Sequence, residues 1–114
     1  MLTLPPRILL ARDPVDFRKQ IDGLAAICEV HLGEQPLGGT LFVFRNSRST
    51  ALKMLVWSHG GFTLLYKKLE RGQFSWPKSE GDRVCLSQAE LVALLEGIDI
   101  SKCCLLYTSD AADE

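Results

Sequence analysis

The fold is decided by LFVFRNSRSTALKMLVWSHGGFTLLYKKLERGQFSWP, residues Leu41–Pro77. Three runs in this stretch are rich in the apolar, β-branched and aromatic residues that strands prefer. They are Leu41–Arg45, Ala51–Trp57 and Phe62–Leu69. The polar segment Asn46–Thr50 separates the first two runs and predicts a turn. The stretch therefore predicts three consecutive strands.

A tight hairpin is expected between the second and third runs. They are joined by Ser58-His59-Gly60-Gly61, and glycine readily adopts the positive φ that a short hairpin turn needs. A further extended segment, Gln73–Trp76, is predicted before Pro77 stops it. These connections predict an antiparallel β-meander.

The residues before this stretch predict one strand and one helix. Pro5-Pro6 and Asp13-Pro14 delimit a short apolar strand, Arg7–Arg12. Asp13 is a good helix N-cap and Pro14 suits the first helical position, so a helix is expected from there to about Leu32. One apolar stripe recurs along it at spacings of three or four: Phe17, Ile21, Leu24, Cys28 and Leu32. Gly33 is predicted to end the helix in the left-handed conformation.

The residues after this stretch predict a second helix. Lys78–Arg83 reads as a polar connector, and Ser87 with Glu90 forms a capping box that opens a helix. Its apolar stripe consists of Leu91, Leu94, Leu95 and Ile98. The predicted fold class is α+β, an antiparallel β-meander packed by two amphipathic helices.

Composition excludes several classes of protein. The chain has 114 residues, of which 46% are hydrophobic and 24% charged, as in a soluble single domain. No apolar run approaches the roughly 18 residues of a membrane helix, and no basic region precedes the first apolar residues, so a cytoplasmic protein without a membrane partner is expected. The four cysteines form no CxxC pair, which predicts free thiols and no metal site.

The last eleven residues, Cys104–Glu114, read CLLYTSDAADE. This string resembles the translation of a transposon-end adapter used in DNA sequencing libraries. We therefore expect residues 1–103 to form the native domain, cut short of its natural C-terminus, and residues 104–114 to be foreign to it. Residues 1–103 carry 13 basic and 11 acidic side chains, so this part is mildly basic although the whole chain has a net charge of −1.

The positive charge is concentrated between Leu41 and Lys78, where seven cations face one acid, Glu70. Such a block is the electrostatic footprint expected of a DNA-binding surface. The candidate phosphate contacts are Arg45, Arg48, Lys53, Lys67, Lys68 and Arg71. Stacking on bases is open to any aromatic side chain that proves to be exposed, among Phe44, Trp57, Phe62, Tyr66 and Trp76. The alternative is that the aromatic residues are core and the cations a solvated face.

No catalytic group is predicted. A metal-dependent nuclease needs carboxylates converging on one pocket, whereas Asp13 and Asp16 are accounted for by helix capping and Asp22 points elsewhere on the helix. Ser58 and His59 lack an orienting acid nearby in the sequence. The expected protein is therefore not an enzyme and needs no cofactor.

Several motifs resemble one family, the small accessory proteins (TnpB, second open reading frame) of insertion-sequence-sixty-six transposons. They are DFRKxxDGLAA at Asp16–Ala26, LFVFRN at Leu41–Asn46, LKMLVW at Leu52–Trp57, GFxLxYKxLExGxFxWP at Gly61–Pro77 and LLEGID at Leu94–Asp99. The chain departs from the family's usual loops at Ser47–Thr50 and Ser58–Gly61. The similarly named RNA-guided nucleases are unrelated and much longer.

This resemblance implies a non-catalytic factor for transposition of a bacterial insertion sequence. Its expected partners are transposon DNA, the cognate transposase and other element-encoded proteins. The basic block favours a role in assembling transposase and DNA through direct DNA contact. The alternative is a pure protein–protein adaptor for the transposase, and the sequence does not separate the two.

Overall fold

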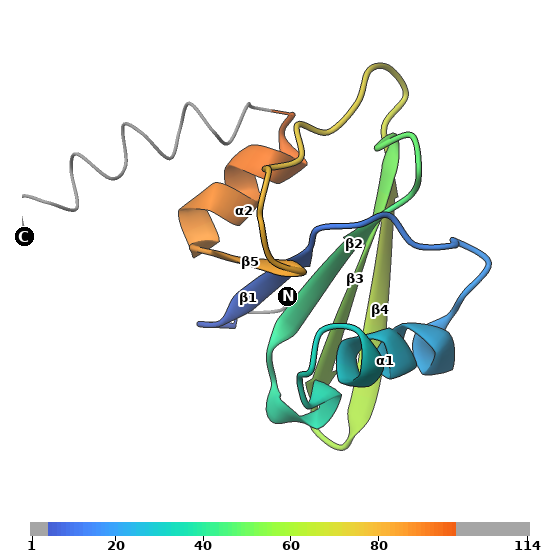
Figure 1. Ribbon diagram of the computed structural model, residues 1–114, viewed down its shortest axis with the longest axis vertical. Coiled ribbons are helices and arrows are strands. Elements are labelled where there is room, and N and C mark those ends of the chain that lie inside the picture. Colours follow the sequence, from blue (N-terminus) through green and yellow to red (C-terminus); the bar gives the residue numbers. More distant parts are fainter. Residues whose placement is uncertain (1–4, 98–114) are drawn as a thin grey trace, which may run out of the picture.

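The stretch from Leu41 onward forms the centre of a five-stranded sheet in the computed structural model, which describes residues 5–97. Figure 1 shows the sheet and its helices. The elements are β1 (Ile8–Ala11), α1 (Ile21–Val30), the 3-10 turn η1 (Pro36–Gly38), β2 (Leu41–Arg45), β3 (Ala51–Ser58), β4 (Gly61–Lys68), β5 (Arg83–Leu86) and α2 (Gln88–Leu95). Within residues 5–97, no helix has the length and apolar character needed to cross a membrane.

The predicted α+β class is confirmed, but the purely antiparallel sheet is wrong. The strand order is β4-β3-β2-β1-β5, and β2, β3 and β4 form the expected antiparallel meander. β1, however, lies parallel to β2, with Ile8 opposite Leu41. The physical reason is the connection through α1, because a long crossover returns the chain to the starting end of the sheet. The sheet is therefore mixed.

The fifth strand lies elsewhere than predicted. Gln73–Trp76 forms no strand, because Phe74 N–H donates to the carbonyl of Ser49 (2.7 Å) and turns this segment across the sheet end. The outer strand is instead β5, antiparallel to β1, with Leu9 opposite Cys85. Its four residues are too few and too mixed in character for a clear strand pattern, and the sequence interpretation placed Arg83 in a connector.

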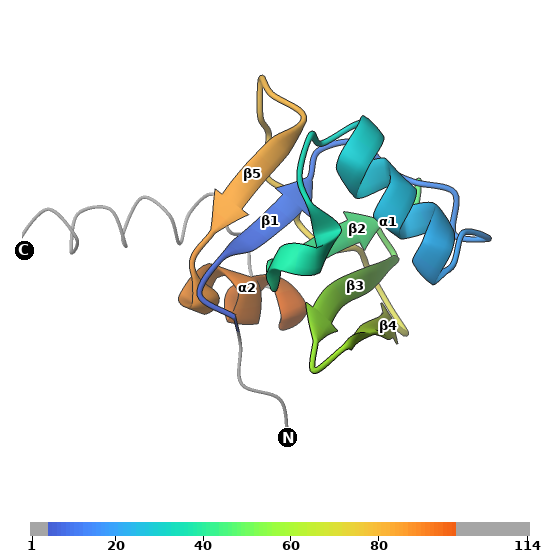
Figure 2. The ribbon, with the colours of Figure 1, turned by 90° about the horizontal axis from the view of Figure 1, so that it is seen from below.

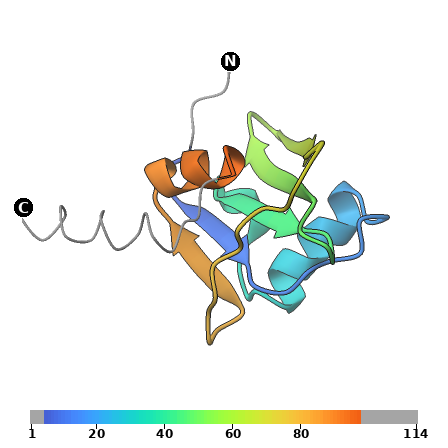
Figure 3. The same ribbon diagram turned by 90° about the horizontal axis from the view of Figure 1, so that it is seen from above.

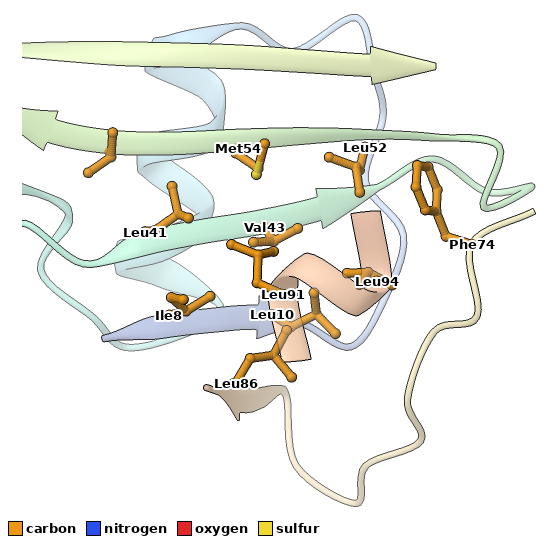
Figure 4. Close-up of a cluster of buried hydrophobic side chains, with 11 residues drawn as sticks. Ile8, Leu10, Leu41, Val43, Leu52, Met54, Phe74, Leu86, Leu91 and Leu94 are labelled. Carbon is orange, nitrogen blue, oxygen red and sulfur yellow. The ribbon is translucent and has the colours of Figure 1, made fainter. Parts of the chain in front are cut away.

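The two helices cover opposite faces of the sheet, as Figure 2 shows. Each face has its own buried cluster, because side chains alternate between faces along every strand. The cluster under α1 contains Leu9, Ala11, Leu24, Cys28, Leu32, Phe42, Phe44 and Leu55. The cluster under α2, drawn in Figure 4, contains Ile8, Leu10, Leu41, Val43, Leu52, Met54, Val56, Phe74, Leu86, Leu91 and Leu94. The sheet is thus the middle layer of three.

The beginning of α2 confirms the predicted capping box. The hydroxyl of Ser87 accepts a hydrogen bond from the backbone N–H of Glu90 (3.0 Å), and the carboxylate of Glu90 accepts one from the backbone N–H of Ser87 (2.8 Å). These bonds satisfy backbone donors that a helix leaves free at its first turn. The remaining stripe residue, Ile98, and the tail Cys104–Glu114 lie outside the described residues.

The beginning of α1 was predicted too early. The helix starts at Ile21, not Pro14, and its N-cap residue makes no side-chain capping bond. Asp13 instead binds the guanidinium of Arg12, and Asp16 binds both the guanidinium and the backbone N–H of Arg18, which closes a turn ahead of the helix. The predicted left-handed conformation of Gly33 is confirmed (φ +64°), and Glu34 N–H donates to the carbonyl of Cys28 (2.8 Å), although α1 itself ends at Val30, two residues before the expected Leu32.

The hairpin between β3 and β4 turns at His59 and Gly60, with Ser58 opposite Gly61. Both turn residues have positive φ, 51° for His59 and 81° for Gly60. The predicted tight turn is confirmed, although a histidine shares the role that was given to glycine alone. Such two-residue turns match the twist of the flanking strands.

We expect the protein to lose stability in acid, and three carboxylates define the range. Hydrogen bonds from Arg12 lower the pKa of Asp13, and hydrogen bonds from Arg7 lower that of Glu34. Hydrogen bonds from the side chain and backbone of Arg18 lower the pKa of Asp16 to about 2.

Because folding lowers each of these pKa values, the stabilisation is complete above the unfolded values of 3.8 for Asp and 4.5 for Glu. It disappears as the pH falls through the folded values. Urea unfolding at a series of pH values should therefore give a plateau above about pH 5 and a steady decrease toward pH 2. A midpoint that stays constant over that range would contradict this assignment.

Candidate nucleic-acid interface

One end of the sheet is built from two segments that are far apart in the sequence. These are the β2–β3 turn, Asn46–Thr50, and the first part of the β4–β5 connection, Leu69–Phe74, which Figure 3 shows from above. Leu69 N–H donates to the carbonyl of Thr50 (2.9 Å), and the side-chain amide of Gln73 donates to the carbonyl of Arg48 (2.8 Å). These bonds hold the two segments side by side.

The β2–β3 turn is fixed from within by Asn46. Its side-chain oxygen accepts hydrogen bonds from the backbone N–H groups of Thr50 (2.9 Å) and Ala51 (3.2 Å), and its amide donates to the Thr50 hydroxyl (2.8 Å). Asparagine closes turns in this way because its short side chain substitutes for backbone partners. Arg48, in the middle of the turn, is therefore presented on an ordered loop.

Four of the six predicted cations are exposed at this end: Arg48, Lys67, Lys68 and Arg71. We call these four residues the basic end. None of them has an ion-pair partner among residues 5–97. Four other arginines, by contrast, do pair with acids: Arg7, Arg12, Arg18 and Arg83. One exposed acid, Glu70, lies next to these four cations in the sequence, so the five side chains together carry a net charge of about +3.

Arg45, by contrast, is partly buried, and its side chain contacts other parts of the protein. Its guanidinium donates to the hydroxyl of Ser49 (2.9 Å) and to the carbonyl of Arg12 (3.0 Å), and it lies 5.6 Å from the centre of the Trp76 ring. These contacts join β2, the end of β1 and the β4–β5 connection. A guanidinium with its donors directed inward is poorly placed to bind phosphate.

Lys53 is buried, with 5% of its surface exposed. Its ammonium donates to the backbone carbonyls of Phe17 and Lys19, both at 2.9 Å. A buried ammonium needs such partners, because an unpaired charge in the interior is costly. Lys53 therefore anchors the segment before α1 to the sheet, and it is not available to DNA in this conformation.

The aromatic candidates are mostly internal. Phe44 is core, Trp57 and Phe62 contact each other edge-to-face at the far end of the hairpin (4.9 Å between centroids), and Trp76 N–H donates to the carbonyl of Ala11 (2.8 Å). Tyr66 differs from them, because 58% of its surface is exposed next to Lys67. The core interpretation thus applies fully to Phe44, whereas Trp57, Phe62 and Trp76 are partly buried and Tyr66 is exposed.

Sequence reasoning passed over Lys19. This lysine is exposed, has no ion-pair partner among residues 5–97, and offers its carbonyl to the Lys53 ammonium. Its position just before α1, in a segment expected to be helical, gave no signal of this placement. It adds one more exposed cation close to β4.

The groups considered for catalysis do not converge. No cluster of three or more His, Cys, Asp or Glu side chains suited to a metal occurs among residues 5–97. A groove of about 490 Å³ lies between the segment before α1 and the helix, and its walls include Asp13, Asp16 and His31. The carboxylates in it are bound to Arg12 and Arg18. Burial raises the pKa of the Cys28 thiol to about 12, which makes it a poor nucleophile.

The chain is similar in sequence to one protein family and to two relatives from one bacterium. The family described as IS66 Orf2 like protein matches residues 6–104. Two relatives come from Sinorhizobium fredii (strain NBRC 101917 / NGR234): "Uncharacterized protein y4hO" is 43% identical over 94 residues, covering 82% of this chain and 81% of the relative. "Uncharacterized protein y4jC" is 37% identical over 93 residues, covering 82% and 80% respectively. No solved structure matches the chain.

Proposed function

The chain belongs to the IS66 Orf2-like family, and from this premise we propose that it is a non-catalytic transposition factor that binds DNA through the basic end. The family is associated with transposition of insertion sequences, and the matched region covers nearly all described residues. The observation that carries the DNA contact is the gathering of Arg48, Lys67, Lys68 and Arg71 without ion-pair partners among residues 5–97. Its expected place of action is the cytoplasm, where the DNA of a bacterial element lies.

Unpaired surface cations on ordered loops suit binding to phosphates. Each cation that neutralises a phosphate releases a condensed counterion, which makes binding favourable at low salt and weak at high salt. Cations already paired with carboxylates would first have to give up those partners. The contrast between the basic end and paired arginines such as Arg7 therefore supports this end as the contact surface.

The same geometry favours contacts with the DNA backbone over reading of bases. The four residues of the basic end lie on a turn, at the end of an edge strand and on a loop. Neither helix contributes a residue to it. Sequence-specific readers usually place a helix or a β-ribbon in the major groove. The proposed role is to hold transposon DNA during assembly with the transposase, without selecting its sequence.

The test in cells is a marked insertion sequence from which only this gene is deleted. We expect transposition to fall sharply and to return when the wild-type gene is supplied on a plasmid. A gene in which Arg48, Lys67, Lys68 and Arg71 are all replaced by Gln should fail to restore it, although the protein accumulates normally. Full restoration by that variant would contradict the DNA-binding role.

An adaptor role for the transposase, without DNA contact, is the second candidate, and it is favoured by the free edge of β4. In the sheet formed by residues 5–97, strand β4 is outermost, and its eight residues pair with β3 on one side only. Leu65, on this strand, is 40% exposed. Exposed edges of this kind accept an extended segment of another protein. Retention of the transposase by the four-Gln variant, together with normal transposition, would favour this role.

A further inference from the structure

Tyr66 is a large aromatic side chain left in solvent beside the basic end. More than half of its surface is exposed, whereas the other aromatic residues considered for stacking are at most half-exposed. Strands usually bury such rings against neighbours. An exposed ring followed in sequence by Lys67 and Lys68 combines a π-face with cations, the two components of single-strand binding surfaces.

The ring is held in place from its inner side. The Phe17 ring meets it edge-to-face, with 6.1 Å between centroids and 60° between planes. The Lys53 ammonium lies 5.9 Å from its centroid and is itself fixed by the carbonyls of Phe17 and Lys19. A ring that is already positioned loses little conformational freedom when a ligand binds.

Alternation along β4 decides which cation shares a face with the ring. Tyr66 lies opposite Lys53 in the sheet register, and Lys68 lies opposite Ala51. Residues two apart point to the same face, so Tyr66 and Lys68 lie together on the α1 side while Lys67 lies on the other. A base stacked on Tyr66 would thus have its own backbone phosphate within reach of a cation on the same face.

We propose that Tyr66 is a stacking platform for an unpaired base, which makes single-stranded DNA the preferred ligand of the basic end. This inference rests on the proposed DNA-binding function and names its ligand. In a duplex each base face is covered by its neighbours, whereas a single strand offers free faces to an aromatic ring. Every base has such a face, so the preference is for unpaired DNA rather than for a sequence.

The test compares two fluorescent single strands of equal length, oligothymidine and an abasic strand that keeps every phosphate but lacks bases. We expect the wild-type chain to bind oligothymidine about 10-fold more tightly by fluorescence anisotropy. Tyr66→Leu should bind the two strands equally. Tyr66→Phe, which keeps the ring, should retain the difference, as should Leu37→Ala, a control at an exposed apolar residue outside the basic end.

The possible results separate the stacking proposal from the proposed DNA-binding function. Equal binding of both strands by the wild-type chain, or an undiminished difference in Tyr66→Leu, would overturn the stacking platform. If the abasic strand still binds in a salt-dependent way in that case, the phosphate contacts are supported. The proposed DNA-binding function would then hold without the stacking platform. Absence of binding to either strand at low salt would overturn the proposed function and this inference together.

Discussion

Replacing Arg48, Lys67, Lys68 and Arg71 together by Gln should lower the affinity for duplex DNA by about 100-fold or more at 50 mM salt. These side chains supply the unpaired positive charge of the basic end, and non-specific DNA binding derives almost entirely from such charge. Fluorescence anisotropy with a labelled transposon-end duplex measures the loss. Because all four side chains are exposed, the free energy of unfolding should change little.

The chain offers a matched control at the opposite end of the sheet. Arg7 immediately precedes β1, which runs parallel to β2, so it lies far from the end that carries Arg48. Arg7→Gln and Lys67→Gln each remove one positive charge. We expect a clear loss of affinity from Lys67→Gln only. Equal losses from both would mean that net charge, rather than the basic end, governs binding.

Replacing Lys53 by Met should destabilise the protein by about 2 kcal/mol while leaving duplex affinity nearly unchanged. The substitution keeps an unbranched apolar stem but removes the ammonium that binds the carbonyls of Phe17 and Lys19. Hydrogen bonds from charged groups contribute roughly 1.5–3 kcal/mol each, and removal of the buried charge offsets part of that loss. Urea unfolding measures the change.

Lys68→Met is the matched control, since it makes the same substitution on the exposed end of β4. Its free energy of unfolding should stay within about 0.5 kcal/mol of wild type, while its affinity for DNA falls. Lys53→Met is therefore expected to lower stability but not DNA affinity, and Lys68→Met to lower DNA affinity but not stability. If Lys53→Met weakens DNA binding and leaves stability intact, the structural role assigned to Lys53 is wrong.

Much of the fold could be predicted because local signals agree with tertiary structure. The strand from Leu41, the His59-Gly60 hairpin and the capping box at Ser87 each depend on residues close in sequence. The parallel pairing of β1 with β2 was missed, since it depends on where the crossover through α1 returns. Nothing local in Arg7–Arg12 distinguishes a parallel from an antiparallel neighbour.

The predicted start of α1 at Pro14 was wrong for a different physical reason. Asp13 and Pro14 form a good helix start, but Arg12, adjacent in the sequence, binds the Asp13 carboxylate, and Val15 N–H donates to the carbonyl of Arg45 in β2. A tertiary hydrogen bond thus outweighs a local preference worth about 1 kcal/mol.

The candidate site shows the same division between local and tertiary information. The basic block could be identified from the sequence. The alternation of side chains along a strand, however, does not predict which of them are buried when helices cover both faces of the sheet. Lys53 and Lys67 look alike in the sequence, but the segment before α1 covers Lys53, and Lys67 remains in solvent. Exposure of Tyr66 likewise follows from its place on an outer strand rather than from its residue type.

The salt dependence of duplex binding tests the proposed DNA contact most directly. Plotting the logarithm of the association constant against the logarithm of salt concentration gives a slope of about −0.9 for each phosphate neutralised. The four cations of the basic end therefore predict a slope of about −3 to −4 for the wild-type chain and one near zero for the four-Gln variant. A wild-type slope near zero, or an equal slope in both proteins, would contradict the claim that the basic end binds DNA.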